Sequence, residues 1–217
     1  MELRMKISII GATGFVGKAL VSEALMRHHQ VTAISRHSNQ LPQHAHLITE
    51  SGDIMDTSWL TSRLKGQDVV ISAFNGGWDN PNLYQDTIAG NQAILHAVQK
   101  SLVQRFIVVG GAGSLEISPG VLLLDSPEFP DKIRPGAQAV KEFKLVLQSI
   151  NSLDWTFVSP AAILEPGERT ETFRLGNNQL LMNGNTPAKI SVQDLSVAIL
   201  DEVEHPQFIR QQFTAAY

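Results

Sequence analysis

The sequence predicts an α/β fold, a doubly wound parallel sheet with helices on both faces, and three observations lead to it. Short apolar runs alternate with amphipathic segments over the first two thirds of the chain. A glycine-rich turn joins the first apolar run to the first amphipathic segment. No internal repeat or low-complexity stretch interrupts this pattern. Strands separated by helices indicate βαβ units, which build parallel sheets with right-handed crossovers.

The apolar runs are short and nearly continuous, which is typical of strands covered on both faces. In chain order the expected strands are 5–10, 30–36, 45–51, 68–74, 105–111 and 154–160. Between them, apolar residues recur at helical spacing. The expected helices are 14–29, 56–64, 82–101 and 137–151. Asp56 is the expected N-cap of the second helix, because its carboxylate can accept a hydrogen bond from a free backbone N–H.

The alternation ends after Pro160, and the last third of the chain is read differently. A hairpin is expected within 171–183, turning at Gly176-Asn177-Asn178. A helix follows over 190–206, opened by Ser191 and Asp194 at capping-box spacing, and 208–217 is a closing strand. We therefore expect one domain over 1–217, in which 161–217 contributes a small lobe on the substrate side.

One long connection, 111–136, contains four prolines and little periodicity. Loops of that length are uncommon and are often functional, so we expect a partly structured flap beside the substrate.

Composition excludes several classes of protein. Hydrophobic residues make up 43% and charged residues 18% of the 217 residues, an ordinary globular balance. A net charge of -4 without a basic run argues against a nucleic-acid partner. No apolar stretch approaches a membrane span, and the N-terminus lacks the apolar core of a secretion signal, so a cytoplasmic location is expected. With no cysteine and no ligand spacing among the seven histidines, no metal site is expected.

The glycine-rich turn predicts a phosphate-binding loop. Gly11 allows a tight strand-to-helix turn, Gly14 lets the backbone approach a pyrophosphate, and Gly17 lets the helix lie close to the strand. The free N–H groups and the positive dipole end of the new helix then face the phosphates. A turn with packing value only is the alternative. The expected loop comprises Gly11, Ala12, Thr13, Gly14, Phe15, Val16 and Gly17. In this context the motif indicates a Rossmann-type dinucleotide site.

The end of the second strand refines the choice of cofactor. Sites that prefer NAD often carry an acidic residue there, which binds the ribose 2′-hydroxyl. This chain has Ser35 and Arg36 instead, and both can donate to a 2′-phosphate. NADP(H) is therefore favoured, with NAD(H) as the alternative. Arg36 as an ordinary solvated surface arginine is the competing interpretation.

Five stretches carry a family resemblance: "IIGATGFVG", "SGDIMD", "DVVISAF", "RFIVVGGAGSL" and "LDWTFVSPAAILEPGERT". Through them the chain resembles the NmrA-like NAD(P)-binding proteins, atypical short-chain dehydrogenases/reductases that include a group labelled NADH-flavin reductases. The resemblance spans nearly the whole chain. It implies an adenine pocket at Asp53 and Ile54, although Asp53 as a plain turn residue stays open. It also implies that further residues border the cofactor, namely Ala73, Phe74, Asn75, Pro160 and Ala161.

The chain departs from the superfamily at the proton donor. Typical members carry a Tyr and a Lys four residues later on one helix, where the Lys lowers the tyrosine pKa. The residue four before Lys141 is Ala137, and neither Tyr84 nor Tyr217 has a Lys four residues on. The acid that reduces a carbonyl is therefore absent. Hydride transfer to a flavin or quinone needs it less, because the charge spreads over a ring.

Two side chains remain as candidate catalytic residues. Ser114 follows the fifth strand, roughly where the superfamily's serine polarises a substrate carbonyl, but it also suits a loop cap. Lys141 is a candidate for binding the nicotinamide ribose, or an exposed helix lysine.

The leading hypothesis is an NAD(P)H-dependent reductase with a small-molecule aromatic acceptor. A nucleotide sensor that binds NAD(P) without turnover is the rival, and an epimerase or dehydratase is disfavoured by the missing Tyr-Lys pair. The sequence leaves a homodimer or a protein partner open.

Overall fold

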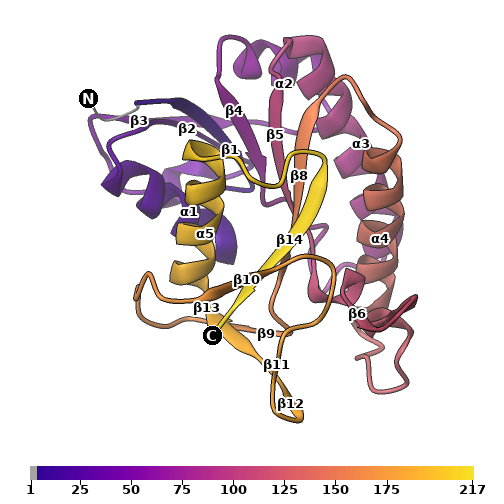
Figure 1. The fold of residues 1–217 in the computed structure, drawn as a ribbon. Helices are drawn as coiled ribbons and strands as arrows, with labels where there is room; N and C mark the ends of the chain where they lie inside the picture. Colours follow the sequence, from indigo (N-terminus) through magenta and orange to yellow (C-terminus); the bar gives the residue numbers. More distant parts are fainter. Residues whose placement is uncertain (1–3) are drawn as a thin grey trace.

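The computed structural model describes residues 4–217. Eight strands form the central sheet in the order β10-β14-β8-β5-β4-β1-β2-β3 (Figure 1). Seven of them run parallel, and only the edge strand β10 is antiparallel to its neighbour. The bounds of these strands are β1 (Lys6–Ile10), β2 (Gln30–Ser35), β3 (Leu47–Ser51), β4 (Val69–Ser72), β5 (Arg105–Val109), β8 (Asp154–Pro160), β10 (Arg174–Gly176) and β14 (Gln211–Ala216).

Helices cover both faces of this sheet. The α-helices are α1 (Phe15–Met26), α2 (Thr57–Leu64), α3 (Leu83–Ser101), α4 (Arg134–Gln148) and α5 (Val192–Glu204). Helices α1 and α5 lie side by side over one face (Figure 1), where one apolar core forms, and α2, α3 and α4 enclose a second core on the other face. The predicted doubly wound α/β fold is confirmed. No helix in the described chain is long and apolar enough to cross a membrane.

The strand order reverses between β1 and β4. From β1 the chain proceeds outward to β2 and β3, then returns to β4 and continues to β5 and β8. At such a switch point the loops that leave the two central strands diverge and open a crevice at the carboxyl ends of the strands. The topology therefore places the glycine-rich turn after β1 opposite the segment that follows β4.

Helix starts in the structure follow the predicted capping residues. The Asp56 carboxylate accepts a hydrogen bond from the Trp59 N–H at 2.9 Å, and the Ser191 hydroxyl accepts one from the Asp194 N–H at 2.9 Å. Helix α4 starts at Arg134, three residues earlier than predicted. Pro135 lies in its first turn, where the missing N–H has no intrahelical partner to lose.

The hairpin predicted within 171–183 is wrong. Its first half, β10, pairs antiparallel with β14, with Leu175 opposite Ala215. The tight hairpin lies further on, between β11 (Met182–Asn183) and β12 (Thr186–Pro187), where Gly184 has a φ of 61°. The two residues between these strands are Gly184-Asn185, and glycine in the first position suits the left-handed conformation, so this dipeptide is a local hairpin signal. The residues of β10, which precede this hairpin, pair instead with the open edge of β14.

Residues 161–217, expected as a small lobe, divide between two places. Helix α5 and strands β10 and β14 belong to the layers of the main fold. The rest lies at the carboxyl end of the sheet, with β9 (Ile163–Glu165) paired parallel to β13 (Lys189–Ser191). The connecting strap, residues 166–173, is held by Asp194, whose carboxylate accepts hydrogen bonds from the backbone N–H groups of Thr170 and Glu171.

The flap 111–136 is largely ordered into short elements. They are η2 (Ala112–Ser114), β6 (Glu116–Ser118), β7 (Val121–Leu122) and η3 (Leu123–Asp125), with one further turn, η1 (Ser38–Gln40), elsewhere. The Glu116 N–H donates to the Asn178 carbonyl at 2.7 Å, and the Leu180 N–H donates to the Glu116 carbonyl at 2.9 Å. The flap is thus bonded to the C-terminal segment across the end of the sheet.

Candidate functional site

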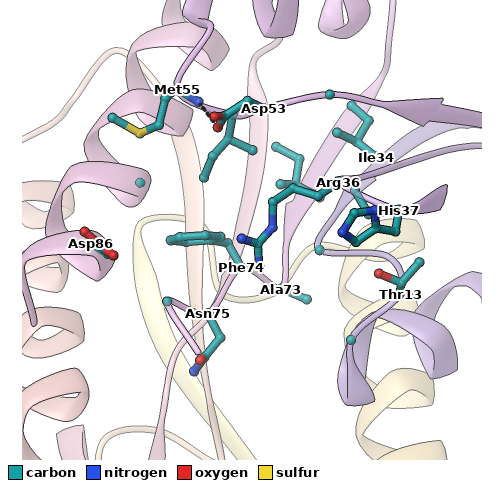
Figure 2. A pocket seen from close by; sticks show the side chains of 18 of the residues that line it. Thr13, Ile34, Arg36, His37, Asp53, Met55, Ala73, Phe74, Asn75 and Asp86 are labelled. Carbon is teal, nitrogen blue, oxygen red and sulfur yellow. Dashed lines mark hydrogen bonds between the residues drawn. The ribbon is translucent and has the colours of Figure 1, made fainter. Parts of the chain in front are cut away.

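A pocket of about 480 Å³ opens at the carboxyl ends of β1, β2 and β4 (Figure 2). It coincides with the switch point of the sheet. The loops after these strands and the first turns of α3 form its walls. The lining residues are Ile10, Gly11, Thr13, Gly14, Ile34, Ser35, Arg36, His37, Gly52, Asp53, Ile54, Met55, Ala73, Phe74, Asn75, Gly76, Asn80, Asp86, Ala89 and Gly90.

Two glycines of the turn after β1 are required by geometry. Gly11 has a φ of 77°, and a Cβ there would lie 2.6 Å from the Ala73 carbonyl oxygen. A Cβ on Gly17 would lie 2.1 Å from the Gly11 carbonyl oxygen. Gly11 therefore lets the turn pass β4, and Gly17 lets α1 start against the turn. Gly14 is the N-cap of α1 and lines the pocket, so the helix N-terminus, with its unpaired N–H groups, opens there.

Basic and hydroxyl side chains gather at the end of β2. Arg36 and His37 are exposed and line the pocket beside Thr13 (Figure 2). Ser35 also lines it, and its hydroxyl is buried without a hydrogen-bond partner in the described residues. Four other hydroxyls, those of Ser8, Ser72, Thr87 and Thr214, are also buried and unpaired in the described residues, but none of them lines the pocket. The donors Ser35 and Arg36 suit a phosphate placed between them.

The loop after β3 supplies the Asp53 carboxylate to the pocket. Asp53 Oδ1 accepts a hydrogen bond from the Met55 N–H at 2.9 Å, so the residue does shape its own turn. It also lines the pocket, as does the adjacent Ile54. The two interpretations of Asp53, turn residue and pocket residue, are compatible in this structure.

Helix α3 closes the pocket against Phe74. A Cβ on Gly90 would lie 2.3 Å from the Phe74 ring and 3.1 Å from the Ile54 side chain. Gly90 therefore lets the helix approach closely enough for these two side chains to form a continuous apolar wall. Ala73, Phe74 and Asn75, expected beside the cofactor, all line the pocket.

Other expected residues lie elsewhere. Ala12 is fully buried in the core, Gly17 is buried in α1, and Phe15 and Val16 are not among the residues that line the pocket. Pro160 is buried at the end of β8, opposite Ala215, and does not line this pocket. Their part in binding stays a prediction.

The Ser114 hydroxyl is turned into the protein. It is buried, donates to the Gly111 carbonyl at 2.9 Å and lies 2.8 Å from the Ser159 hydroxyl. Gln212 donates to that Ser159 oxygen at 2.8 Å and itself accepts from the Lys144 ammonium. In this chain of hydrogen bonds each group donates to the next, from Lys144 through Gln212, Ser159 and Ser114 to the Gly111 carbonyl. Burial lowers the pKa of Lys144, although nearby Glu116 opposes the shift. In this arrangement Ser114 caps its loop.

The remaining proton-donor candidates are also engaged away from the pocket. The Lys141 ammonium lies 3.7 Å from Asp125 Oδ1, and this ion pair joins α4 to the flap. The Tyr84 hydroxyl donates to Glu142, whose carboxylate raises the tyrosine pKa. The Tyr217 hydroxyl donates to Asp194 at 2.8 Å. None of the three lines the pocket.

Several pocket residues were not anticipated from the sequence. His37, Met55, Asn80, Asp86 and Ala89 all line it. His37 simply adjoins the predicted Arg36. Asp86 and Ala89 lie on the first turns of α3, and only the placement of that helix, through Gly90 and Phe74, brings them to the site. Two adjacent small residues near the start of this helix, Ala89 and Gly90, are the one local signal of a close approach by another element.

The switch-point pocket, the glycine turn and the phosphate-binding donors define a Rossmann-type dinucleotide-binding protein. The residues present fit such a cofactor, since the unpaired Ser35 hydroxyl and the helix N-terminus at Gly14 both lack the acceptor that a phosphate provides. A family model described as NAD(P)H-binding matches residues 11–206. The chain belongs to the NAD(P)H-binding family.

Related proteins cover nearly the whole chain. The uncharacterized protein YwnB of Bacillus subtilis (strain 168) is 36% identical over 214 residues, 97% of each chain. A solved structure from Bacteroides thetaiotaomicron, named as a "putative epimerase", is 42% identical with a TM-score of 0.93 and covers 99% of this chain and 98% of its own. Another, named as a "putative NADH-flavin reductase" from Streptococcus pneumoniae TIGR4, is 33% identical with a TM-score of 0.80, covering 98% and 99%. The resemblance to NAD(P)-binding proteins that include a group labelled NADH-flavin reductases is thus confirmed.

Proposed function

We propose that this protein is an NAD(P)H-dependent oxidoreductase that transfers hydride to a flavin, a quinone or a similar aromatic acceptor, with NADPH as the favoured donor. One observation carries the proposal: a dinucleotide pocket at the switch point occurs with no tyrosine available as proton donor, because both tyrosine hydroxyls donate to carboxylates elsewhere. The similarity to a protein named as a flavin reductase supports the same reading.

The chain's own residues divide the work of binding. The N-terminus of α1 at Gly14 would hold the pyrophosphate, and Ser35 and Arg36 would donate to the 2′-phosphate. Ile54 and Phe74 would border the adenine, and the turn 110–114 together with Pro160 would lie toward the nicotinamide. The bound dinucleotide supplies hydride. The fixed Ser114 hydroxyl would hold the turn in place rather than give up a proton.

An aromatic acceptor suits this site better than a ketone. A ketone becomes an alkoxide as hydride arrives, so a positioned acid contributes about 10²–10⁴-fold to its reduction. A ring acceptor delocalises the charge and takes its proton from water, so it depends mainly on orientation. The same argument applies to the epimerase named among the relatives, whose chemistry in this superfamily also leans on the Tyr-Lys pair. The class of acceptor and a cytoplasmic location of the protein are both parts of this proposal.

The test is NADPH oxidation with FMN, riboflavin and a small quinone, with NADPH binding titrated in the same preparation. We expect tight binding and turnover well above the uncatalysed rate. Gly14→Asp, purified identically, should lose both, because a carboxylate would face the pyrophosphate. Turnover that survives in Gly14→Asp would mark a contaminating reductase.

A nucleotide sensor is the second candidate, favoured by the inward orientation of Ser114 and the engaged tyrosines. Tight binding of NADPH or NADP⁺ without turnover on any acceptor would establish it and contradict the reductase.

A further inference from the structure

A second hollow, of about 560 Å³, opens beside the dinucleotide pocket. The loop after β4, the first turn of α3 and two residues from the start of α4 and just before it form its walls. Asn80 lines both this hollow and the dinucleotide pocket, so the two cavities meet at that residue. We call the second cavity the Trp78 hollow. Its lining residues are Trp78, Asp79, Asn80, Pro81, Leu83, Tyr84, Gln85, Lys132 and Pro135.

The Trp78 indole is the largest apolar surface that this hollow presents to solvent. Its exposed fraction is 51%, whereas Trp155 is 4% exposed and Trp59 is partly buried, with its ring against Gly52. No aromatic ring within residues 4–217 stacks on Trp78. An indole face left in water forgoes both the burial and the stacking that another flat ring would provide.

The loop that carries Trp78 is held in one shape. Gly77 has a φ of 94°, its N–H donates to Asn75 Oδ1 at 2.7 Å, and its carbonyl accepts from the Asn80 N–H at 3.0 Å. Asp79 pairs with Lys132 at 2.7 Å and so connects the loop to the segment before α4, although an exposed ion pair adds little stability. The indole thus stands on a fixed backbone, which lowers the entropy cost of binding a ligand against it.

The hollow also lies near the turn toward which the nicotinamide extends in the proposed function. Leu83 of the lining packs against the start of α4, since a Cβ on Gly136 would lie 3.1 Å from its side chain. A Cβ on Gly113, in the turn 110–114, would lie 3.3 Å from the side chain of the next residue of α4, Ala137. Adjacent residues of α4 therefore contact the lining of the hollow and that turn.

We propose that the Trp78 hollow binds the aromatic acceptor, with the acceptor ring stacked on the Trp78 indole. The inference rests on the proposed function, since it requires an acceptor that takes hydride from the neighbouring dinucleotide. Indole is an electron-rich ring, whereas the rings of flavins and quinones are flat and electron-poor, so the stacked faces attract each other beyond the area that they bury. A carbonyl compound without a ring gains none of this attraction. Trp78 acts here as a specificity residue for the acceptor.

The experiment measures the binding of FMN, riboflavin and a small quinone by calorimetry, without NADPH. Trp78→Leu keeps an apolar side chain but removes the flat ring, and acceptor binding should weaken about tenfold. Trp78→Phe keeps a ring, and acceptor binding should stay within about threefold of the wild-type value. In both variants the dissociation constant of NADPH should change less than about twofold, because Trp78 does not line the dinucleotide pocket.

Steady-state rates of NADPH oxidation give an independent readout. In Trp78→Leu the KM for the acceptor should rise about tenfold, whereas kcat at saturating acceptor should change less than about twofold, because the lost contact only binds the ring. A general loss of structure would lower kcat and weaken NADPH binding as well. Ile48→Ala is the control, since it shortens an apolar side chain that is 61% exposed on β3, away from both cavities, and it should change neither quantity.

Unchanged acceptor affinity in Trp78→Leu would overturn the inference, and NADPH oxidation by the same preparation would leave the proposed function standing. Equal losses in Trp78→Phe and Trp78→Leu would overturn it too, because the ring would not be the determinant. A wild-type dimer that Trp78→Leu converts to a monomer, seen by size-exclusion chromatography, would assign the indole to a contact between copies instead. Absence of NADPH oxidation by the wild-type protein with every acceptor would overturn the proposed function itself.

Discussion

Arg36 is a single guanidinium at the end of β2, and it should decide between the two nicotinamide cofactors. Arg36→Asp removes the charge-assisted hydrogen bond to a 2′-phosphate and places a carboxylate against it, so NADPH binding should weaken about 100-fold. NADH carries a 2′-hydroxyl at this place, and the new carboxylate can accept a hydrogen bond from it. The affinity of the protein for NADH should therefore change less than about threefold. Dissociation constants for both cofactors, measured by fluorescence titration, check this.

The matched control for Arg36→Asp is Arg63→Asp, at an exposed arginine whose guanidinium lies 3.5 Å from Glu50 and outside the pocket. It should leave both affinities unchanged. Equal losses of NADPH and NADH in Arg36→Asp would refute the assignment of the 2′-phosphate.

A substitution at Gly17 tests how the glycine-rich turn packs against α1, separately from how the turn binds phosphate. Gly17→Ala would place a Cβ 2.1 Å from the Gly11 carbonyl oxygen, a backbone atom that cannot rotate away. The turn or α1 must shift, and the free energy of unfolding should fall by about 2–3 kcal/mol. Urea unfolding measures it. Gly111→Ala, where no atom lies within 4 Å of the new Cβ, is the comparison and should change stability by less than about 0.5 kcal/mol.

At this scale the sequence anticipated the residues that follow strands and missed those that come from a helix. Gly11, Gly14, Ser35 and Arg36 line the pocket because each lies at or just beyond the end of a predicted strand. Asp86 reaches the site only through the way α3 seats on Phe74, and no local pattern encodes that contact. Ser114 had two readings, and its orientation depends on Ser159, distant in the chain.

Helix α3 ends in a strained residue. Leu102, its C-cap, has a φ of 66° and is 80% exposed, so it takes the left-handed conformation without burying its side chain. Glycine adopts this conformation without the steric cost of a Cβ. Leu102→Gly should therefore raise the free energy of unfolding by about 0.5–1 kcal/mol. Thermal and urea unfolding would show it, and a loss of stability would mean that the leucine makes contacts that outweigh the strain.

Among elements, the alternating strands and helices were predictable because burial on both faces leaves continuous apolar runs. The strand pairings near the C-terminus were not. Strand β10 has only three residues, two of them exposed, and its partner β14 follows more than thirty residues later. Neither periodicity nor composition can signal such a pairing, whereas the Gly184-Asn185 turn is a local signal in the sequence.

Over the whole molecule, one charge cluster connects the C-terminal strap to the first helix. Glu23 on α1 is 3% exposed, and its carboxylate accepts from Arg169 of the strap at 2.7 Å and from Arg27 at 2.7 Å. Burial acts to raise the pKa of Glu23, but the two arginines outweigh it and hold the pKa below the ordinary value of 4.5. Arg27 extends the cluster to Asp201 and Glu204 of α5.

Acid should therefore release this connection. In the unfolded chain the Glu23 carboxyl titrates near 4.5, above its folded value, so its contribution is complete above about pH 4.5 and is lost as the pH falls through the folded pKa. Glu23→Gln should cost about 3 kcal/mol of stability at pH 7, a difference that shrinks below pH 4.5. Urea unfolding between pH 3 and 7 measures both proteins. A gap that stays constant with pH would contradict the ionic origin, and Asp201→Asn, at a half-exposed partner, should have a much smaller effect.

Because α1 packs against α5, the order of synthesis determines when the apolar side of α1 becomes covered. Every residue that lines the pocket lies between Ile10 and Gly90, yet the helix that covers α1 begins only at Val192. At ordinary rates of synthesis, α1 emerges on the order of ten seconds before its partner. During that interval its apolar side faces water, and β8 lacks β14 along one edge. The nascent chain can thus form the segments that line the pocket well before the packing that fixes their positions is complete.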